Sequence, residues 1–180
     1  MQSVTDPGVW TGVEFDKKEA IVFELGARHL AEMDANLKQV RARDLKTESI
    51  ERQDFPLHAI ADELSALSAE LQHGKGLLVV RGFPIDEYSL TDLEILYWGF
   101  GTHLGVAVSQ SVMGDRLGHV IDVTDTDPHA RAYRNHQELT LHTDFSDVVS
   151  FLSVRKAKLG GLSWFASALA VHNEIQRTRP

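Results

Sequence analysis

Hydrophobic residues in the first part of the chain recur every three or four positions, which is the spacing of one face of an α-helix. This pattern predicts helices over about 26–43 and about 57–73, and Gly74 stands where a glycine commonly follows a helix. A third helix is predicted from Ser89, which opens a pattern typical of a capping box, to Gly101. The three apolar stripes are Leu30, Met33, Leu37 and Val40; Ile60, Leu64, Leu67 and Leu71; and Leu93, Leu96, Tyr97 and Phe100.

The second part of the chain favours strands. A short apolar run between Gly76 and Gly82 predicts a buried strand, and a glycine pair at 160–161 marks a turn. A last helix is expected from about 168 to 176. Helices followed by strands are typical of an α+β protein whose strands share one sheet system. Short strand-like or irregular pieces are expected at 13–15 and 21–23, and the other predicted strands are 106–108, 119–123, 139–144, 148–155 and 163–167.

Length and composition indicate a single globular domain. A chain of 180 residues suits one domain over 1–180, with 1–75 mainly helical and 76–180 forming the core. A formal net charge of −8 without a basic cluster argues against nucleic acid and anionic membrane surfaces as partners. There is no cysteine, no apolar run of transmembrane length and no secretory pattern at the start, so we expect a cytoplasmic protein.

The candidate chemistry begins with His142-Thr143-Asp144. Side chains at positions i and i+2 of a strand point to the same face, so His142 and Asp144 can offer an imidazole nitrogen and a carboxylate oxygen to one point. These are two of the three ligands of the facial triad that binds non-haem Fe(II). The tripeptide alone is a weak signal, and the alternative is a surface strand with a solvated aspartate.

The residues around this tripeptide resemble a known family. The segments 131–139, 141–149 and 155–163 are similar to the TauD/TfdA family of Fe(II)- and 2-oxoglutarate-dependent dioxygenases. The resemblance runs in order along nearly the whole chain, and Trp10-Thr11-Gly12 resembles the start of its longer, fungal-like members. The earlier segments that carry it are Phe55-Pro56-Leu57, 74–84, and Leu104-Gly105 followed by Ser109-Gln110.

The resemblance implies a fold and a reaction. The fold would be a double-stranded β-helix, a jelly roll of the clavaminate synthase-like type, with the N-terminal helices packed outside it. His142 and Asp144 would hold Fe(II), with 2-oxoglutarate as co-substrate and O₂ as oxidant. The expected function is C–H hydroxylation of a small organic substrate with release of succinate and CO₂. The resemblance does not name the substrate.

Three further residues are candidates by the same resemblance. Ser163 follows the glycine pair where many relatives have a threonine that hydrogen-bonds the 2-oxoglutarate carboxylate, although a serine in a surface turn is an equal alternative. Tyr133 and Asn135 lie just before the predicted metal ligands, where the family lines its substrate pocket. Relatives often have glycine at the place of Ala132, so the local backbone can differ.

Two expected groups of the family site are missing from the 180 residues. The family places a second metal-binding histidine much later in the chain, with an arginine beyond it that pairs with 2-oxoglutarate. His172 is too close to His142 and is expected on a helix surface. We therefore expect a jelly roll that is truncated at its C-terminal end, with open edges that favour aggregation or a homo-oligomer.

Two hypotheses remain open from the sequence, together with a weaker third. The chain is either part of an active dioxygenase, or a shortened, inactive scaffold with a binding role or no role. Metal-assisted hydrolysis by His142 and Asp144 is less favoured, because no second histidine cluster is present.

Overall fold

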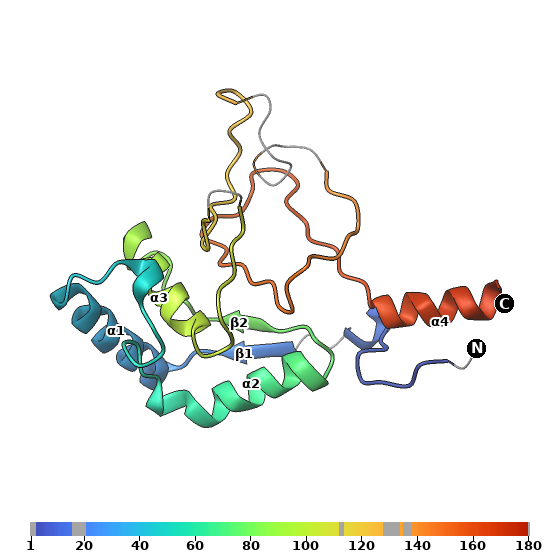
Figure 1. The fold of residues 1–180 in the computed structure, drawn as a ribbon, viewed down its shortest axis with the longest axis horizontal. Helices are drawn as coiled ribbons and strands as arrows, with labels where there is room; N and C mark the ends of the chain where they lie inside the picture. Colours follow the sequence, from blue (N-terminus) through green and yellow to red (C-terminus); the bar gives the residue numbers. More distant parts are fainter. Residues whose placement is uncertain (1–2, 16–20, 112–113, 128–133, 135–137, 180) are drawn as a thin grey trace. The chain divides into compact units, whose positions relative to one another are not determined.

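The computed structural model describes residues 3–15, 21–111, 114–127, 134 and 138–179. The chain divides into two compact units, Met1–Gly105 with Leu152–Pro180 and Val106–Phe151. Every helix and strand of the described residues lies in the first unit (Figure 1). Its elements are the 3-10 helices η1 (Gly12–Phe15), η3 (Thr47–Ser49) and η4 (His58–Ile60), the strands β1 (Val22–Glu24) and β2 (Val79–Arg81), and the helices α1 (Ala27–Ala42), α2 (Ala61–His73), α3 (Leu90–Gly101) and α4 (Ala168–Thr178).

The predicted helices are confirmed, and three of them share the core of the first unit. Helix α1 contacts both α3 and η4, which leads directly into α2. Phe55 and Ile60 are fully buried between these elements. Burial of such a side chain contributes roughly 1.5–3 kcal/mol, so this cluster is the main source of stability. The other core side chains with an exposed fraction of 3% or less are Met33, Leu37 and Val40 on α1, Leu57 and Leu64 near α2, Leu93 and Leu96 on α3, and Ile50.

Ser89 is the N-cap of α3, as its sequence pattern predicts, although the backbone N–H bond that would complete a capping box is not among the described contacts. The Ser89 hydroxyl accepts a hydrogen bond from the Asp92 backbone N–H over 3.3 Å and donates one to the Asp92 carboxylate over 2.7 Å. Asp92 is buried, and its other carboxylate oxygen lies 2.5 Å from Nη2 of Arg41 on α1. Asp92 therefore takes part in the cap of α3 and joins this helix to α1 through its ion pair with Arg41.

Strands β1 and β2 form a parallel two-stranded sheet with Val22 opposite Val79. The strand predicted between Gly76 and Gly82 is thus found, but its predicted burial is wrong, because the Val79 side chain is 38% exposed. Gly82 follows β2 with φ of +90°, and a Cβ there would lie 2.9 Å from the Leu25 carbonyl oxygen. Glycine is required where the chain passes this closely.

The strands predicted beyond Gly105 are not formed in the described residues. The segments 106–108, 119–123, 139–144, 148–155 and 163–167 contain no strand among the residues that the structure describes. A strand must pair its backbone groups with a neighbour, and the apolar side chains here lie in solvent, with Phe145 88% and Phe151 75% exposed. The described part of the chain is α+β with few strands, and it does not show a double-stranded β-helix.

The last predicted helix is present as α4. The Ser167 hydroxyl accepts a hydrogen bond from the Ala170 backbone N–H over 3.0 Å and so caps the helix. Figure 1 shows α4 beside the N-terminal segment, within the first compact unit. Among the described residues, no helix is both long and apolar enough to cross a membrane.

Candidate metal centre

His142 and Asp144 lie together in the second compact unit. The His142 Nδ1 lies 2.7 Å from the Thr140 carbonyl oxygen, and a carbonyl oxygen only accepts, so Nδ1 carries the hydrogen and donates. The lone pair of the ring is then on Nε2, which lies 4.0 Å from Oδ1 of Asp144. Both side chains are about half exposed, at 53% and 51%, so solvent reaches the pair.

This arrangement presents two metal donors on one side of the segment. A metal-binding histidine commonly donates its other ring N–H to a backbone carbonyl, which fixes the tautomer and the ring direction. Two ligands about 2.1 Å from an ion at right angles lie about 3 Å apart. The 4.0 Å between Nε2 and Oδ1 is close to that distance, so a small side-chain rotation would bring both atoms to one ion.

A third donor is not found beside this pair. Within residues 3–15, 21–111, 114–127, 134 and 138–179, no group of three or more histidine, aspartate or glutamate side chains could hold a metal ion. The described residues therefore fit two positions of a facial triad and leave the other positions to groups outside them.

Ser163 follows a left-handed turn in the first compact unit. Gly160 and Gly161 have φ of +73° and +69°, which confirms the predicted glycine turn. A Cβ at Gly161 would lie 2.8 Å from the Cβ of Ala157, so the turn requires glycine for space as well as for conformation. The Ser163 side chain is exposed. Ser163 and the pair His142–Asp144 belong to different compact units.

The two predicted substrate-side residues, Tyr133 and Asn135, lie outside the described residues. Their assignment stays a prediction. His172 is where the sequence placed it, on the exposed surface of α4, and its Nε2 lies 2.9 Å from the Gln176 amide nitrogen. Within the described residues, His172 belongs to no group of side chains that could hold a metal ion.

His103 joins two distant parts of the first unit by a hydrogen bond, which the sequence alone does not indicate. Its Nε2 donates a hydrogen bond to the Phe55 carbonyl oxygen over 2.8 Å, just beyond the end of α3. Burial lowers the pKa of the His103 imidazole, while this hydrogen bond acts in the opposite direction. The ring also borders a surface hollow of about 450 Å³ beside α2. No local sequence signal predicts this, because Phe55 is 48 positions away.

The comparison with known proteins decides the family. The model of the taurine catabolism dioxygenase TauD, TfdA family matches residues 41–180 of the chain. The chain belongs to the TauD/TfdA family. The match includes His142, Asp144 and Ser163, and it confirms the resemblance that the sequence motifs indicate.

Two curated relatives of this TauD/TfdA chain are hydroxylase-like or biosynthetic by name. FR-33289 synthase of Streptomyces rubellomurinus is 26% identical over 180 residues, covering 98% of this chain and 53% of the relative. The taurine hydroxylase-like protein SAT17 of Stachybotrys chartarum is 26% identical over 186 residues, covering 98% of this chain and 48% of the relative. The chain thus spans about half the length of the curated relatives it matches.

Proposed function

We propose that this chain carries part of the active site of an Fe(II)- and 2-oxoglutarate-dependent dioxygenase that hydroxylates a C–H bond of a small organic substrate. The observation that carries the proposal is the pair His142 and Asp144 in a TauD/TfdA chain. The hydrogen bond from Nδ1 of His142 to Thr140 leaves Nε2 free and turned toward the carboxylate of Asp144.

Each residue has a proposed task. His142 supplies a neutral nitrogen and Asp144 a negative oxygen, so together they bind a divalent ion and offset half of its charge. Bound Fe(II) would supply the oxidising chemistry, with O₂ as oxidant and 2-oxoglutarate leaving as succinate and CO₂. Ser163 is proposed to donate a hydrogen bond to a 2-oxoglutarate carboxylate. Tyr133 and Asn135 are proposed to contact the substrate.

The proposed frame for this site is the family's double-stranded β-helix, with α1, α2 and α3 outside it. The third metal ligand and the arginine for 2-oxoglutarate would come from outside the described residues. A cytoplasmic location, the absence of nucleic-acid and membrane partners, and a homo-oligomer are parts of the same proposal. The substrate class is left open, because a family supports many substrates.

An anaerobic titration with Fe(II) and 2-oxoglutarate tests the proposal. Chelation of protein-bound iron by 2-oxoglutarate gives a visible charge-transfer band, which should saturate for the wild-type chain. The band should be lost in His142→Ala and kept in His172→Ala, which removes an exposed histidine of α4. A wild-type band that persists in His142→Ala would show that the iron binds elsewhere.

An inactive scaffold is the second candidate function. It is favoured by the lack of a three-donor group among the described residues. Circular dichroism of the titrated sample separates an inactive folded chain from an unfolded one. A folded wild-type chain that gives no band would be inactive by itself, as the scaffold predicts, whereas a saturable band would support the dioxygenase.

A further inference from the structure

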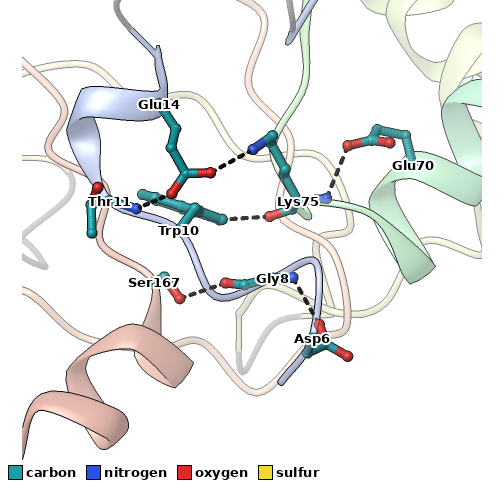
Figure 2. Close-up of polar contacts among 8 residues, drawn as sticks. All are labelled: Asp6, Gly8, Trp10, Thr11, Glu14, Glu70, Lys75 and Ser167. Carbon is teal, nitrogen blue, oxygen red and sulfur yellow. Dashed lines mark hydrogen bonds and ion pairs between the residues drawn. The ribbon is translucent and has the colours of Figure 1, made fainter. Parts of the chain in front are cut away.

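The N-terminal segment, residues 4–15, holds the beginning and the middle of α4. The side-chain amide of Asn173 pairs with both backbone groups of Val4, since Nδ2 donates to the Val4 oxygen and Oδ1 accepts from the Val4 N–H, each over 2.8 Å. The Ser167 hydroxyl donates to the Gly8 carbonyl oxygen over 2.5 Å (Figure 2). These contacts join residues 159 and 169 positions apart in the sequence.

The other end of the same segment is attached to the turn after α2. The indole N–H of Trp10 donates to the Lys75 carbonyl oxygen over 2.9 Å, and the Lys75 ammonium lies 3.1 Å from a carboxylate oxygen of Glu14 (Figure 2). The same ammonium lies 5.3 Å from the centre of the Phe15 ring, within range of a cation–π contact. Trp10 is 9% exposed and packs edge-on against Phe15. The segment is therefore fixed at both ends.

Helix α4 depends on this segment for its position. It has 11 residues, and a helix of this length is marginal in water without tertiary contacts. In the described part of the chain, α4 shares no extensive contact with another helix or strand. Its apolar side chains Val171 and Ile175 are 50% and 54% exposed. Among the described residues, the hydrogen bonds to Val4 and Gly8 therefore attach α4 to the N-terminal segment.

We propose that residues 4–15 form a clasp that positions α4 and, with it, the segment 160–167 that carries Ser163. Ser167 caps α4 and is held by Gly8, so the chain leaving the glycine turn at 160–161 is fixed at its far end. Ser167 and Asn173 are positioning residues in this arrangement. The role of Ser163 toward 2-oxoglutarate rests on the proposed function, whereas the clasp itself rests only on the contacts of the first unit.

Two substitutions separate the clasp from local helix stability. Ser167→Asp keeps an acceptor for the Ala170 N–H but cannot donate to Gly8, and Asn173→Asp keeps the acceptor for Val4 N–H but loses the donor. Ser167→Thr keeps both functions and should rescue. Glu174→Gln is the matched control, because Glu174 lies on α4 but its side chain pairs with Arg177 on the same helix.

Hydrogen exchange followed by mass spectrometry of the full chain measures the effect. Loss of one net hydrogen bond predicts roughly tenfold faster exchange of the peptides covering α4, residues 168–178, in both aspartate variants. Ser167→Thr and Glu174→Gln should exchange like the wild type. The clasp would be refuted by unchanged exchange in the aspartate variants, or by an equal increase in Glu174→Gln.

The anaerobic titration adds a second measurement, the 2-oxoglutarate concentration at half-saturation, which a change in helix stability alone would not alter. The aspartate variants should need severalfold more 2-oxoglutarate for half-saturation of the band, at an unchanged Fe(II) requirement, and Ser167→Thr should restore the wild-type value. An unchanged requirement for 2-oxoglutarate would overturn the link to Ser163. If the wild type gives no band, these 180 residues do not complete the iron site by themselves, and the exchange of the α4 peptides alone decides whether the clasp holds this helix.

Discussion

His29, in the first turn of α1, accepts a hydrogen bond that only a neutral ring can accept. Its Nδ1 lies 2.9 Å from the Gly26 backbone nitrogen, and the residue is 6% exposed. Burial lowers the pKa of this imidazole, and the neighbouring Arg28 guanidinium acts in the same direction. The neutral ring thus satisfies one of the N–H groups that a helix start leaves without a partner.

The lowered pKa of His29 predicts acid sensitivity. The unfolded chain, with a pKa near 6.5, takes up the proton more readily than the folded one, so the stability is complete above about pH 6.5 and falls below it. The free energy of unfolding in urea should therefore decrease from pH 7.5 to pH 5. The decrease should be smaller in His29→Asn, whose side-chain oxygen can accept but does not titrate in this range.

His172→Asn is the control for this experiment, because His172 is exposed on α4. Its decrease between the two pH values should equal that of the wild type. His103, whose pKa is also lowered by burial, contributes in the same direction, so His29→Asn should reduce the decrease without abolishing it. An identical pH dependence in His29→Asn and the wild type would contradict the prediction.

At the scale of elements, α3 contains a glycine that the packing requires. A Cβ on Gly99 would lie 2.4 Å from the ring of Phe55, which is fully buried. Replacing a helical glycine by alanine usually stabilises by roughly 0.5–1 kcal/mol, but overpacking a core costs roughly 1–3 kcal/mol. The larger cost should prevail, so Gly99→Ala is expected to destabilise the chain by about 1–2 kcal/mol.

Gly101→Ala provides the matched comparison for Gly99→Ala. Gly101 is the last residue of α3, and a Cβ there would meet nothing within 4 Å. This variant should be neutral or slightly more stable in a thermal or urea melt. If both variants changed the melt equally, the effect would belong to the helix backbone rather than to contact with Phe55.

Local patterns explain which elements the sequence could predict. The stripe that contains Leu37 and the N-cap at Ser89 could be predicted from the sequence, because helical contacts and caps join residues three or four positions apart. The same holds for His142 and Asp144, which are two positions apart. The strands predicted after Gly105 are not formed in the described residues, because a strand forms only with partners elsewhere in the sequence and alternation alone does not provide them.

At the scale of the whole molecule, long-range attachment is invisible to such patterns. Val4 and Asn173 pair across 169 positions, and neither residue carries a motif that predicts the contact. The hydrogen bond between His103 and the Phe55 carbonyl group is of the same kind. Family resemblance predicts the chemistry of the TauD/TfdA site but not how this chain holds α4, because those contacts involve backbone groups whose partners the sequence does not specify.

The exposed apolar residues of the second half predict self-association of the purified 180-residue chain. Phe145 and Phe151 in the second unit are 88% and 75% exposed, and Leu159 and Trp164 in the first are 93% and 76% exposed. Soluble monomers rarely expose this much large apolar surface, and unpaired strand-like segments add edges that can pair with another copy. Light scattering coupled to size-exclusion chromatography should therefore show a mass that rises with concentration.

Serine substitutions identify the surface responsible for this association. The double variant Phe145→Ser and Phe151→Ser should shift the mass toward the 20.1 kDa monomer, because each removes an exposed aromatic side chain without emptying a core position. Val13→Ser, at a residue 76% exposed on η1, is the control and should associate like the wild type. A concentration-independent monomer with a cooperative melt would show that these side chains find partners within one chain, and would therefore refute association through them.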